Sequence, residues 1–393
     1  MVISAPSVPT QRGVRQNLPA LLALALAGCL AVTTEMLPVG LLPAIGDAFD
    51  VGESTTGLLV MVYATMVAVF SVPLTIATRR LPRKPLILVT VCAYLVSNVL
   101  IAVAPTFAVV AAGRVVGGLS HALFFSVCIG YVPRLVESGQ VGRGLALVSG
   151  GATAGFVLGV PVSTALGSVV GWRNAFAALA VVAAITLVLV ARLLPSVSGA
   201  PAGRRIQRRG TRTDLGIVVS SNMLTFVGQY TLYTYITVVF LAAGAHESSM
   251  GPILLLCGVC GLVGLAGMGR TIDRHPRTTV LTVLALLAVA IFGVWLAQEW
   301  FVVVVIAVAF WNGVFGGVPS MYQSAAVRAM PDAPEIAGAW INATSNVGIA
   351  LGAVVGGRLL TSTWGISSLS WFGATLVLMG LGVALVGKRA FPG

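Results

Sequence analysis

An acidic residue stands inside an apolar stretch near the start of the chain. Glu35 lies in a run from about residue 20 to residue 45, which is long enough to cross a bilayer as a helix of roughly 20 residues. A carboxyl group at that depth costs about 2.5–3.5 kcal/mol on insertion scales, so it rarely persists without a use. Pro38 lacks a backbone donor and can kink the helix beside the acid. We interpret Glu35 as a group that binds and releases a proton; the alternative is a neutral or paired structural acid.

Two further ionisable residues fall inside a later apolar stretch, residues 106–131. Arg114 lies roughly 7 Å to the outer side of the middle of that helix, at 1.5 Å per residue, and Glu35 lies at a similar depth. A nearby guanidinium favours the charged carboxylate and burial opposes it, so a change of surroundings can move a proton. His121 follows Arg114 by seven residues on the same helical face and is of a type that titrates near neutrality. The alternatives are a static or carbonyl-binding arginine and a packing histidine.

The composition defines the class of protein that holds these residues. The 393 residues are 58% hydrophobic and 9% charged, with a mean hydropathy of +1.00, whereas soluble domains carry about 25% charged residues. The chain is therefore predicted to be a multi-pass membrane protein, and a water-soluble enzyme is excluded. The net charge of +12 is spread in short basic clusters between apolar runs, which indicates membrane topology and no nucleic-acid partner.

Twelve apolar stretches are each long enough to span a bilayer, and all should be helical because lipid offers the backbone no partners. With the N-terminus inside, the inner loops carry twenty Lys and Arg residues and the outer loops carry only Arg173 and Arg358. This asymmetry predicts that both termini are cytoplasmic. The approximate stretches are 19–44, 54–77, 85–104, 106–131, 143–168, 173–193, 215–241, 249–270, 278–297, 300–325, 336–360 and 367–387.

The longest polar break, residues 195–214, divides the chain six helices from six and reads as a cytoplasmic linker between residues 1–194 and 215–393. The two halves also echo one another at an offset of 193 or 194 residues. The matches are Pro82-Arg83 with Pro276-Arg277, Gly155 and Gly159 with Gly348 and Gly352, and Glu35 with Gln229. An internal duplication of this kind predicts two halves that bind a substrate between them, near the middle of the membrane.

Polar and aromatic residues within the apolar stretches indicate the wall of a cavity. Amides and aromatic rings without a second buried acid suit amphipathic small molecules, although some will hold helices together instead. The candidate substrate-binding residues are Thr34, Asn222, Gln229, Tyr230, Tyr233, Trp311, Asn312, Trp340, Asn342 and Asn346.

Glycines recur every three or four residues at Gly151, Gly155 and Gly159, with Pro161 next, and again around Gly258 and around Gly348. Such faces allow close helix packing. They predict either a sliding interface between the halves or ordinary packing within the membrane.

With these features placed, the chain resembles the major facilitator superfamily, and within it the twelve-helix drug/proton antiporter branch, in particular the arabinose/chloramphenicol efflux permease group. The run Arg79-Arg80-Leu-Pro-Arg83-Lys84 is similar to the superfamily loop signature Asp-Arg-x-Gly-Arg-Lys. Arg79 stands where the signature has its aspartate, so the gating role of that aspartate does not carry over to this half. The copy in the second half, Asp273-Arg274-His-Pro-Arg277, keeps the acid.

Two more motifs carry the resemblance. Arg114-Val-Val-Gly-Gly118 is similar to the antiporter arginine motif, and Gly159-Val-Pro161 with the glycines before it is similar to the antiporter glycine–proline motif. The resemblance implies that the first and fourth helices line the cavity of the N-terminal half, which would bring Glu35 and Arg114 together.

These features predict a proton-coupled secondary exporter of amphipathic small molecules, including chloramphenicol-like antibiotics, that works by alternating access. The alternatives are a sugar or metabolite permease, a transport-dead membrane sensor and a membrane-embedded enzyme. No nucleotide-binding loop, His-Glu-x-x-His motif or nucleophile elbow occurs in the sequence, which counts against ATP as energy source and against an enzyme. We expect no cofactor and no metal, and a monomer whose partners are the substrate, protons and the lipid bilayer.

Overall fold

The computed structural model describes residues 13–51, 53–137, 140–196, 212–246, 249–272, 274–298, 300–360 and 362–391. Within these ranges the chain forms fifteen α-helices and one short 3-10 helix, and each of the twelve predicted stretches contains helix. Nine helices of the described part are long and apolar enough to cross a membrane. The prediction of an all-helical, multi-pass membrane protein is confirmed.

The first group of helices, here called the N-terminal bundle, has a core cluster of buried residues drawn from positions 20 to 194. Its first apolar stretch is not one straight helix, because α1 ends at Met36 and Pro38 lies in the 3-10 turn that follows. The elements are α1 (Leu18–Met36), η1 (Leu37–Gly40), α2 (Leu42–Phe49), α3 (Glu53–Thr78), α4 (Arg83–Ala102), α5 (Phe107–Leu135), α6 (Val141–Val170) and α7 (Trp172–Leu193).

The second group, the C-terminal bundle, has a separate core cluster drawn from positions 215 to 391. Two of its apolar stretches are also broken, one at Thr234 and Tyr235 and the other at Gly316 and Gly317. The elements are α8 (Arg212–Tyr233), α9 (Ile236–Ala242), α10 (Met250–Thr271), α11 (Pro276–Leu296), α12 (Phe301–Phe315), α13 (Val318–Ala329), α14 (Pro334–Leu360) and α15 (Ser367–Val386).

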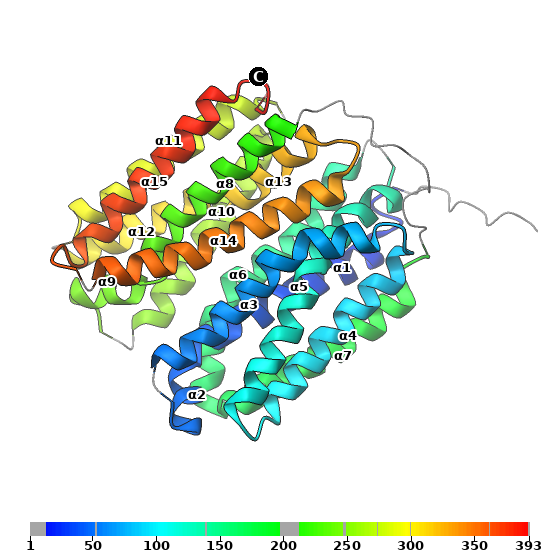
Figure 1. Ribbon diagram of the computed structural model, residues 1–393, viewed down its shortest axis with the longest axis horizontal. Coiled ribbons are helices and arrows are strands. Elements are labelled where there is room, and N and C mark those ends of the chain that lie inside the picture. Colours follow the sequence, from blue (N-terminus) through cyan, green and yellow to red (C-terminus); the bar gives the residue numbers. More distant parts are fainter. Residues whose placement is uncertain are drawn as a thin grey trace, which may run out of the picture.

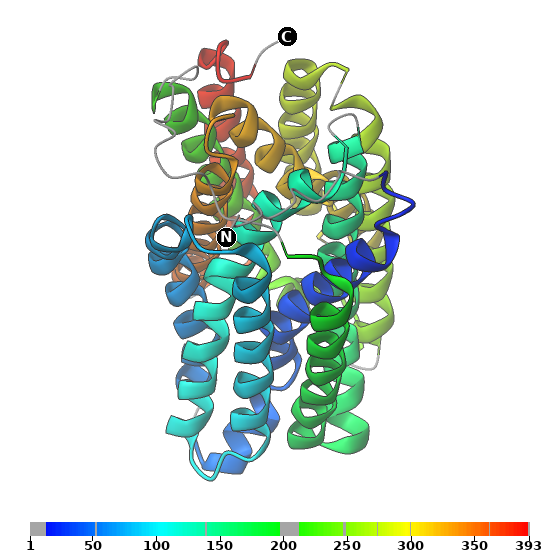
Figure 2. The ribbon, with the colours of Figure 1, turned by 90° about the vertical axis from the view of Figure 1, so that its right-hand side faces the viewer.

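The two bundles lie side by side, with α14 running along α3 (Figure 1). Helices α14 and α10 of the C-terminal bundle meet α3, α5 and α6 of the N-terminal bundle. In Figure 2 the N-terminal bundle, blue to green, faces the viewer. A site between α1, α5 and α6 on one side and α8, α12 and α14 on the other would therefore lie between the two cores.

Glycine faces hold helices together mostly inside each bundle. A Cβ atom added to Gly155 would lie 2.8 Å from the carbonyl oxygen of Cys29 in α1, and one added to Gly352 would lie 2.8 Å from the carbonyl oxygen of Val227 in α8. Helix α6 thus packs on α1 as α14 packs on α8. The expectation of a sliding interface between the halves is not met at these glycines; Gly258 does face the other bundle, at Val157 of α6.

Candidate functional site

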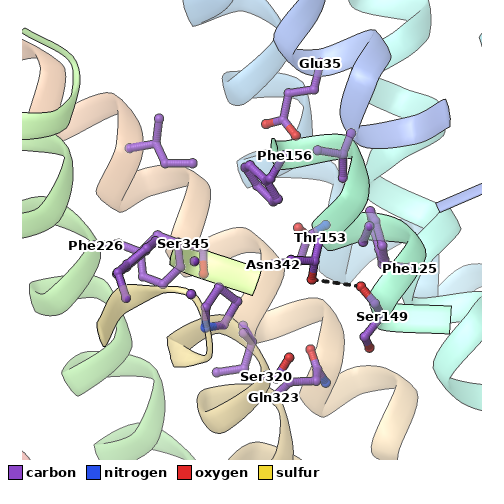
Figure 3. Close-up of a pocket in the computed structure, with 18 of the residues that line it drawn as sticks. Glu35, Phe125, Ser149, Thr153, Phe156, Phe226, Ser320, Gln323, Asn342 and Ser345 are labelled. Carbon is purple, nitrogen blue, oxygen red and sulfur yellow. Dashed lines mark hydrogen bonds between the residues drawn. The ribbon is translucent and has the colours of Figure 1, made fainter. Parts of the chain in front are cut away.

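A cavity of about 260 Å³ lies between the two bundles and is lined by both. Figure 3 shows Glu35 at one end, with Ser320 and Gln323 at the other. The wall is mostly apolar and aromatic with a few polar groups, as in sites for small molecules. The lining residues that bear on function are Glu35, His121, Phe125, Ser149, Thr153 and Phe156 from the N-terminal bundle and Phe226, Gln229, Tyr230, Tyr233, Asn312, Phe315, Ser320, Gln323, Asn342, Ser345 and Asn346 from the C-terminal bundle.

The carboxyl group of Glu35 enters this cavity from the last turn of α1. Its side chain is only 9% exposed, and Oε2 lies 3.7 Å from Nδ1 of His121 on α5. The structure therefore brings together two of the three residues predicted to handle protons. Both line the cavity, so a bound molecule could touch either of them.

Arg114, the third residue predicted to handle protons, binds the backbone at the end of α1 and not the Glu35 carboxyl group. Its side chain is fully buried and donates three hydrogen bonds to main-chain carbonyl oxygens, those of Leu59 (3.1 Å), Thr34 (2.8 Å) and Glu35 (3.1 Å). Pro38 has no N–H to bond the Thr34 carbonyl four residues before it, and the guanidinium takes that place. Proximity to Glu35 was predicted correctly, but the hydrogen bond goes to the Glu35 backbone, and Arg114 does not line the cavity.

Tyr63 on α3 links these groups and was missed in the sequence. Its hydroxyl shares a hydrogen bond of 3.0 Å with His121 Nδ1, and the guanidinium of Arg114 lies 4.1 Å from its ring centre. Gly118 lets α3 approach α5, since a Cβ there would lie 2.8 Å from the Tyr63 carbonyl oxygen. The pair of glycines that follows Arg114 indicated that another helix packs closely there, but it did not show which helix. Nδ1 of His121 therefore lies between a phenol and a carboxyl group.

The opposite wall is made of neutral polar groups held in place by their neighbours. Gln229 lines the cavity, and its Oε1 accepts a hydrogen bond of 2.7 Å from Nε1 of Trp311. Asn342 donates to Ser71 Oγ of α3 at 3.2 Å and so joins the two bundles. Asn346, which lines the cavity, donates to the Asn342 carbonyl oxygen, and its own Oδ1 is buried without a hydrogen-bond partner. This wall offers fixed hydrogen-bond donors and acceptors.

Four candidate substrate-binding residues lie elsewhere. Thr34 Oγ1 accepts a hydrogen bond from Asn98 (3.1 Å) inside the N-terminal bundle. Asn222 donates to Thr344 and Ser345 and so holds α8 to α14. Trp311 stands behind Gln229, and Trp340 is 41% exposed on the outer surface. Their hydrogen bonds therefore assign Thr34 and Asn222 to helix packing and Trp311 to the support of the wall. Trp340 is not part of the cavity wall.

The wall that α6 contributes to the cavity was not predicted from the sequence. Ser149, Thr153 and Phe156 line the cavity, and Thr153 donates to the Ser149 carbonyl at 3.0 Å (Figure 3). They lie on a different face of α6 from Gly151 and Gly155, which pack on α1. The four-residue spacing of Ser149 and Thr153 was the available signal, but the glycine motif drew attention to the packed face.

The basic loop after α3 forms a link between the bundles. Arg83 is buried and pairs with Glu335 at the start of α14, and Arg134 at the end of α5 lies 3.5 Å from the same carboxylate. Arg83 also donates to the Arg79 carbonyl oxygen at 2.8 Å. Gly130 leaves room for this carboxylate, because a Cβ there would overlap it. Glu335 was not singled out in the sequence. Its carboxylate supplies an acid to this basic cluster, in which Arg79 stands at the position of the signature aspartate.

The remaining motif residues are less involved. Arg80 and Arg274 are exposed, Lys84 is half-buried, and Asp273 lies outside the described residues. Arg277 donates to the carbonyl oxygens of Leu385 (3.1 Å) and Phe391 (3.5 Å), so it ties α11 to the end of its own bundle. Pro161 lies inside α6, which continues unbroken to Val170.

Two membrane-spanning helical bundles with a cavity between their cores define the architecture of a secondary transporter. A family model described as Major Facilitator Superfamily matches residues 24–353, and the chain belongs to this family. Proteins of this family are transporters, and the chain is a multi-pass protein of the cell membrane. The resemblance to the superfamily is confirmed, and the drug/proton antiporter branch stays a prediction.

Solved structures show the same fold. The human organic anion transporter MFSD10 (TETRAN) superimposes with a TM-score of 0.76 at 19% identity, over 94% of this chain and 99% of that chain. The E. coli fucose:proton symporter FucP gives a TM-score of 0.74 at 13% identity, over 94% of this chain and 98% of that chain. At these identities the likeness is one of fold alone.

Proposed function

We propose that this protein is a proton-coupled exporter of amphipathic small molecules that works by alternating access. The observation that carries the proposal is the carboxyl group of Glu35, which faces a cavity between the two bundles and lies 3.7 Å from His121. Ionisable residues within membrane spans mark proton or substrate pathways. In this proposal residues 1–194 and 215–393 are the two halves that move, joined by the linker 195–214.

The proton step uses the N-terminal bundle alone. Glu35 takes a proton when the cavity opens to the more acidic side and loses it when the cavity opens to the other. His121, which shares a hydrogen bond with Tyr63, is the nearest group with which the carboxyl can exchange hydrogen bonds. Arg114 holds the end of α1 and keeps the carboxyl group at the cavity wall in both states.

The ion cluster of Arg83, Arg134 and Glu335 serves as the gate at one end of the cavity. It joins α4 and α5 of one bundle to α14 of the other, so the bundles cannot separate there while it is intact. The asymmetry of basic residues assigns this end to the cytoplasmic side. Opening inward would then require the buried Arg83–Glu335 pair to break and become hydrated.

A second candidate is a sugar or metabolite permease, in either direction. The observation that favours it is the row of amides at Gln229, Asn312, Asn342 and Asn346, which line the cavity and could bind hydroxyl groups. FucP, which shares the fold, is a fucose:proton symporter. Among the described lining residues, six phenylalanine and tyrosine rings, including Phe125 and Phe226, favour ligands with a substantial apolar surface.

Transport by purified protein in proteoliposomes tests these assignments. A pH gradient is imposed, and the accumulation of chloramphenicol, of amphiphilic antibiotics and of fucose is followed for the native protein, Glu35→Gln and Glu137→Gln. Glu137 is exposed at the end of α5 and serves as the matched control.

We expect uphill movement of the amphiphiles by the native and Glu137→Gln proteins. In Glu35→Gln, which mimics a permanently protonated acid, exchange should remain while uphill movement is lost. Accumulation of fucose alone would favour the permease, and full uphill transport by Glu35→Gln would remove the carboxyl from the mechanism.

A further inference from the structure

We propose that Asn342 couples a ligand in the cavity to the opening of the cytoplasmic end of the transporter. In the closed arrangement its amide binds Ser71 of the other bundle, and once the bundles part the same amide binds a carbonyl or hydroxyl oxygen of the ligand. The proposal rests on the proposed function for alternating access between the bundles. It goes beyond that function by naming the residue that links the ligand to the gate and the ligand group that this residue recognises.

One face of α14 makes three contacts with the N-terminal bundle in a row. Glu335 holds the ion cluster described above, a Cβ atom added to Gly338 would lie 2.5 Å from Cδ1 of Ile129 in α5, and Asn342 donates to Ser71 at 3.2 Å. Steps of three and four residues keep these positions on one face of a helix. At 1.5 Å per residue, Asn342 lies about 10 Å further into the membrane than Glu335. The face thus joins an ion cluster at the cytoplasmic end to a neutral hydrogen bond beside the cavity.

Asn342 belongs both to the cavity wall and to the interface between the bundles. Its side chain is half-buried and lines the cavity, where Figure 3 labels it. Ser71 is fully buried and is not part of the cavity wall. A ligand that touches Asn342 therefore reaches a side chain whose hydrogen bond crosses to the other bundle, while Ser71 itself stays out of the reach of the ligand.

Breaking this hydrogen bond costs the two partners unequally. The Ser71 hydroxyl donates its own hydrogen to the Val67 carbonyl oxygen of the same helix at 2.6 Å, and it keeps that bond when the bundles part. For Nδ2 of Asn342, Ser71 is the acceptor that the described part of the chain provides, and an amide donor left without an acceptor in such a place is costly. A ligand oxygen that takes over this donor binds the open arrangement more tightly than the closed one, and so shifts the equilibrium toward opening.

Further hydrogen bonds continue from Ser71 into the helix that carries part of the gate. The Ser71 carbonyl oxygen accepts from Thr75 at 2.7 Å, and the Thr75 hydroxyl shares a hydrogen bond of 2.8 Å with Ser126 of α5. At the end of α5, Arg134 lies 3.5 Å from the Glu335 carboxylate. The neutral bond and the ion cluster therefore join the same helices, α14 on one side and α3 with α5 on the other. Loosening the first weakens the hold of the second.

The amide of Asn342 also defines the ligand group. Its Oδ1 receives only a long hydrogen bond of 3.4 Å, from Nδ2 of Asn346 one turn further along α14. A primary carboxamide offers an oxygen to Nδ2 and N–H groups to Oδ1, and a hydroxyl group can serve either atom. A carboxylate would bring an uncompensated charge against a mostly apolar wall. The ligand is therefore a neutral molecule in which a carboxamide or hydroxyl group adjoins an apolar body.

Two probes that differ in one polar group test the proposal, 4-phenylbutanamide and butylbenzene. Their binding to the purified full-length protein is measured together with the distance between nitroxide labels at Arg80→Cys and Asp332→Cys. These two residues are exposed on either side of the ion cluster, and the five native cysteines are replaced by alanine. The variants are Ser71→Ala, Asn342→Ala and the two combined. Thr186→Ala is the matched control, since it removes a buried hydroxyl that donates to a carbonyl oxygen of its own helix, α7.

We expect 4-phenylbutanamide, and not butylbenzene, to lengthen the distance between the labels. Ser71→Ala should raise the ratio of open to closed protein about three- to tenfold without a probe, the size of one hydrogen bond. It should also raise the affinity for the amide by a similar factor, because more of the protein is then in the arrangement that binds it; a merely structural role would lower that affinity or leave it unchanged. Asn342→Ala, alone or combined, should bind butylbenzene but lose the response to the amide, and Thr186→Ala should behave as the native protein does.

An equal change of distance with both probes, or a Ser71→Ala protein with unchanged amide affinity, would overturn the proposal. Parallel transport assays in proteoliposomes separate it from the proposed function. If 4-phenylbutanamide is driven uphill by a pH gradient while the label distance ignores it, the exporter stands and the coupling through Asn342 falls. If the amide opens the cytoplasmic end through Asn342 but nothing moves uphill, the coupling stands and the exporter falls.

Discussion

The two bundles bury polar groups of different kinds at matching positions. Glu35 in α1 and Gln229 in α8 lie 194 residues apart in the sequence, and both face the cavity. Around Glu35 the N-terminal bundle places His121, Tyr63 and a buried arginine. Around Gln229 the C-terminal bundle places an indole N–H from Trp311 and neutral amides.

The helix packing of the two bundles differs much less than their buried polar side chains do. Gly155 brings α6 onto α1, and Gly352 brings α14 onto α8 in the same way. Two similarly packed bundles can therefore keep matching glycine contacts while one carries titratable groups and the other carries neutral hydrogen-bonding groups. Under the proposed function, a proton loads one wall of the cavity without changing the hydrogen-bond pattern of the other.

The largest effect should come from Arg114→Ala in the N-terminal bundle. The change leaves three main-chain carbonyls without their donor in a buried place, and we expect a loss of roughly 3–5 kcal/mol in stability. Thermal unfolding in detergent measures it. Asn222→Ala, which removes an amide between α8 and α14 in the other bundle, should cost about 1–3 kcal/mol. Equal losses would mean that the two bundles rely on buried polar groups to the same degree.

The next effect concerns the ion cluster that joins the bundles. Glu335→Gln removes the charge that both Arg83 and Arg134 approach, and it leaves the buried guanidinium of Arg83 without its carboxylate. We expect turnover to fall about tenfold, as for a loss of about 1.4 kcal/mol in one state of the cycle, with substrate affinity changed by much less. Initial rates and binding, measured side by side, check this. Arg80→Ala, which removes an exposed charge in the same loop, is the control and should leave both unchanged.

A smaller effect should distinguish Tyr63 of the N-terminal bundle from Tyr233 of the C-terminal bundle. Tyr63→Phe removes the hydroxyl from Nδ1 of His121 and leaves that nitrogen free to accept from protonated Glu35. The pH midpoint of uphill transport should therefore move to higher pH, by up to about one unit for one hydrogen bond. Tyr233→Phe, at the opposite wall, should change substrate affinity and leave the midpoint in place. A midpoint that moves with Tyr233 instead would contradict the division between the bundles.

The smallest effect is expected from the hydrogen bond that Trp311 donates to Gln229. Trp311→Phe keeps an aromatic ring but deletes the N–H that Gln229 accepts, at a cost of about 1 kcal/mol. Substrate affinity should fall by roughly fivefold or less, with no change in proton coupling, as measured by binding and by the ratio of protons to substrate moved. Loss of coupling in this variant would place part of the proton pathway in the C-terminal bundle.

The sequence predicted the helical membrane fold because apolar length and charge asymmetry are local properties. Counting residues along a helix gives depth, and depth correctly predicted that Arg114 lies near Glu35; His121 was a candidate for proton handling, but its contact with the Glu35 carboxyl group was not predicted. Depth does not give rotation about the helix axis, and for this reason Arg114 was expected at the carboxylate but binds the carbonyls. Asn222 and Trp340 were misplaced for the same reason.

Contacts between segments that are far apart in the chain could not be predicted from the sequence. Glu335 pairs with Arg83 across 252 positions, and no local pattern announces that meeting. Tyr63 is likewise one tyrosine in an apolar run until α3 and α5 are brought together at Gly118. The α6 wall was hidden because its glycines and its polar residues share the same stretch and point to different neighbours.

The way in which Arg114 holds α1 has a consequence for how such a protein can change over time. The guanidinium binds main-chain carbonyl groups, which every residue type has. The helix junction beside Pro38 therefore does not depend on the side chain at position 35. Under the proposed function, replacing that one side chain would change the ion that the protein exchanges without rebuilding the helix junction. Coupling and architecture would then be inherited separately, and a single substitution would turn an exchanger with this joint into a passive carrier, or back again.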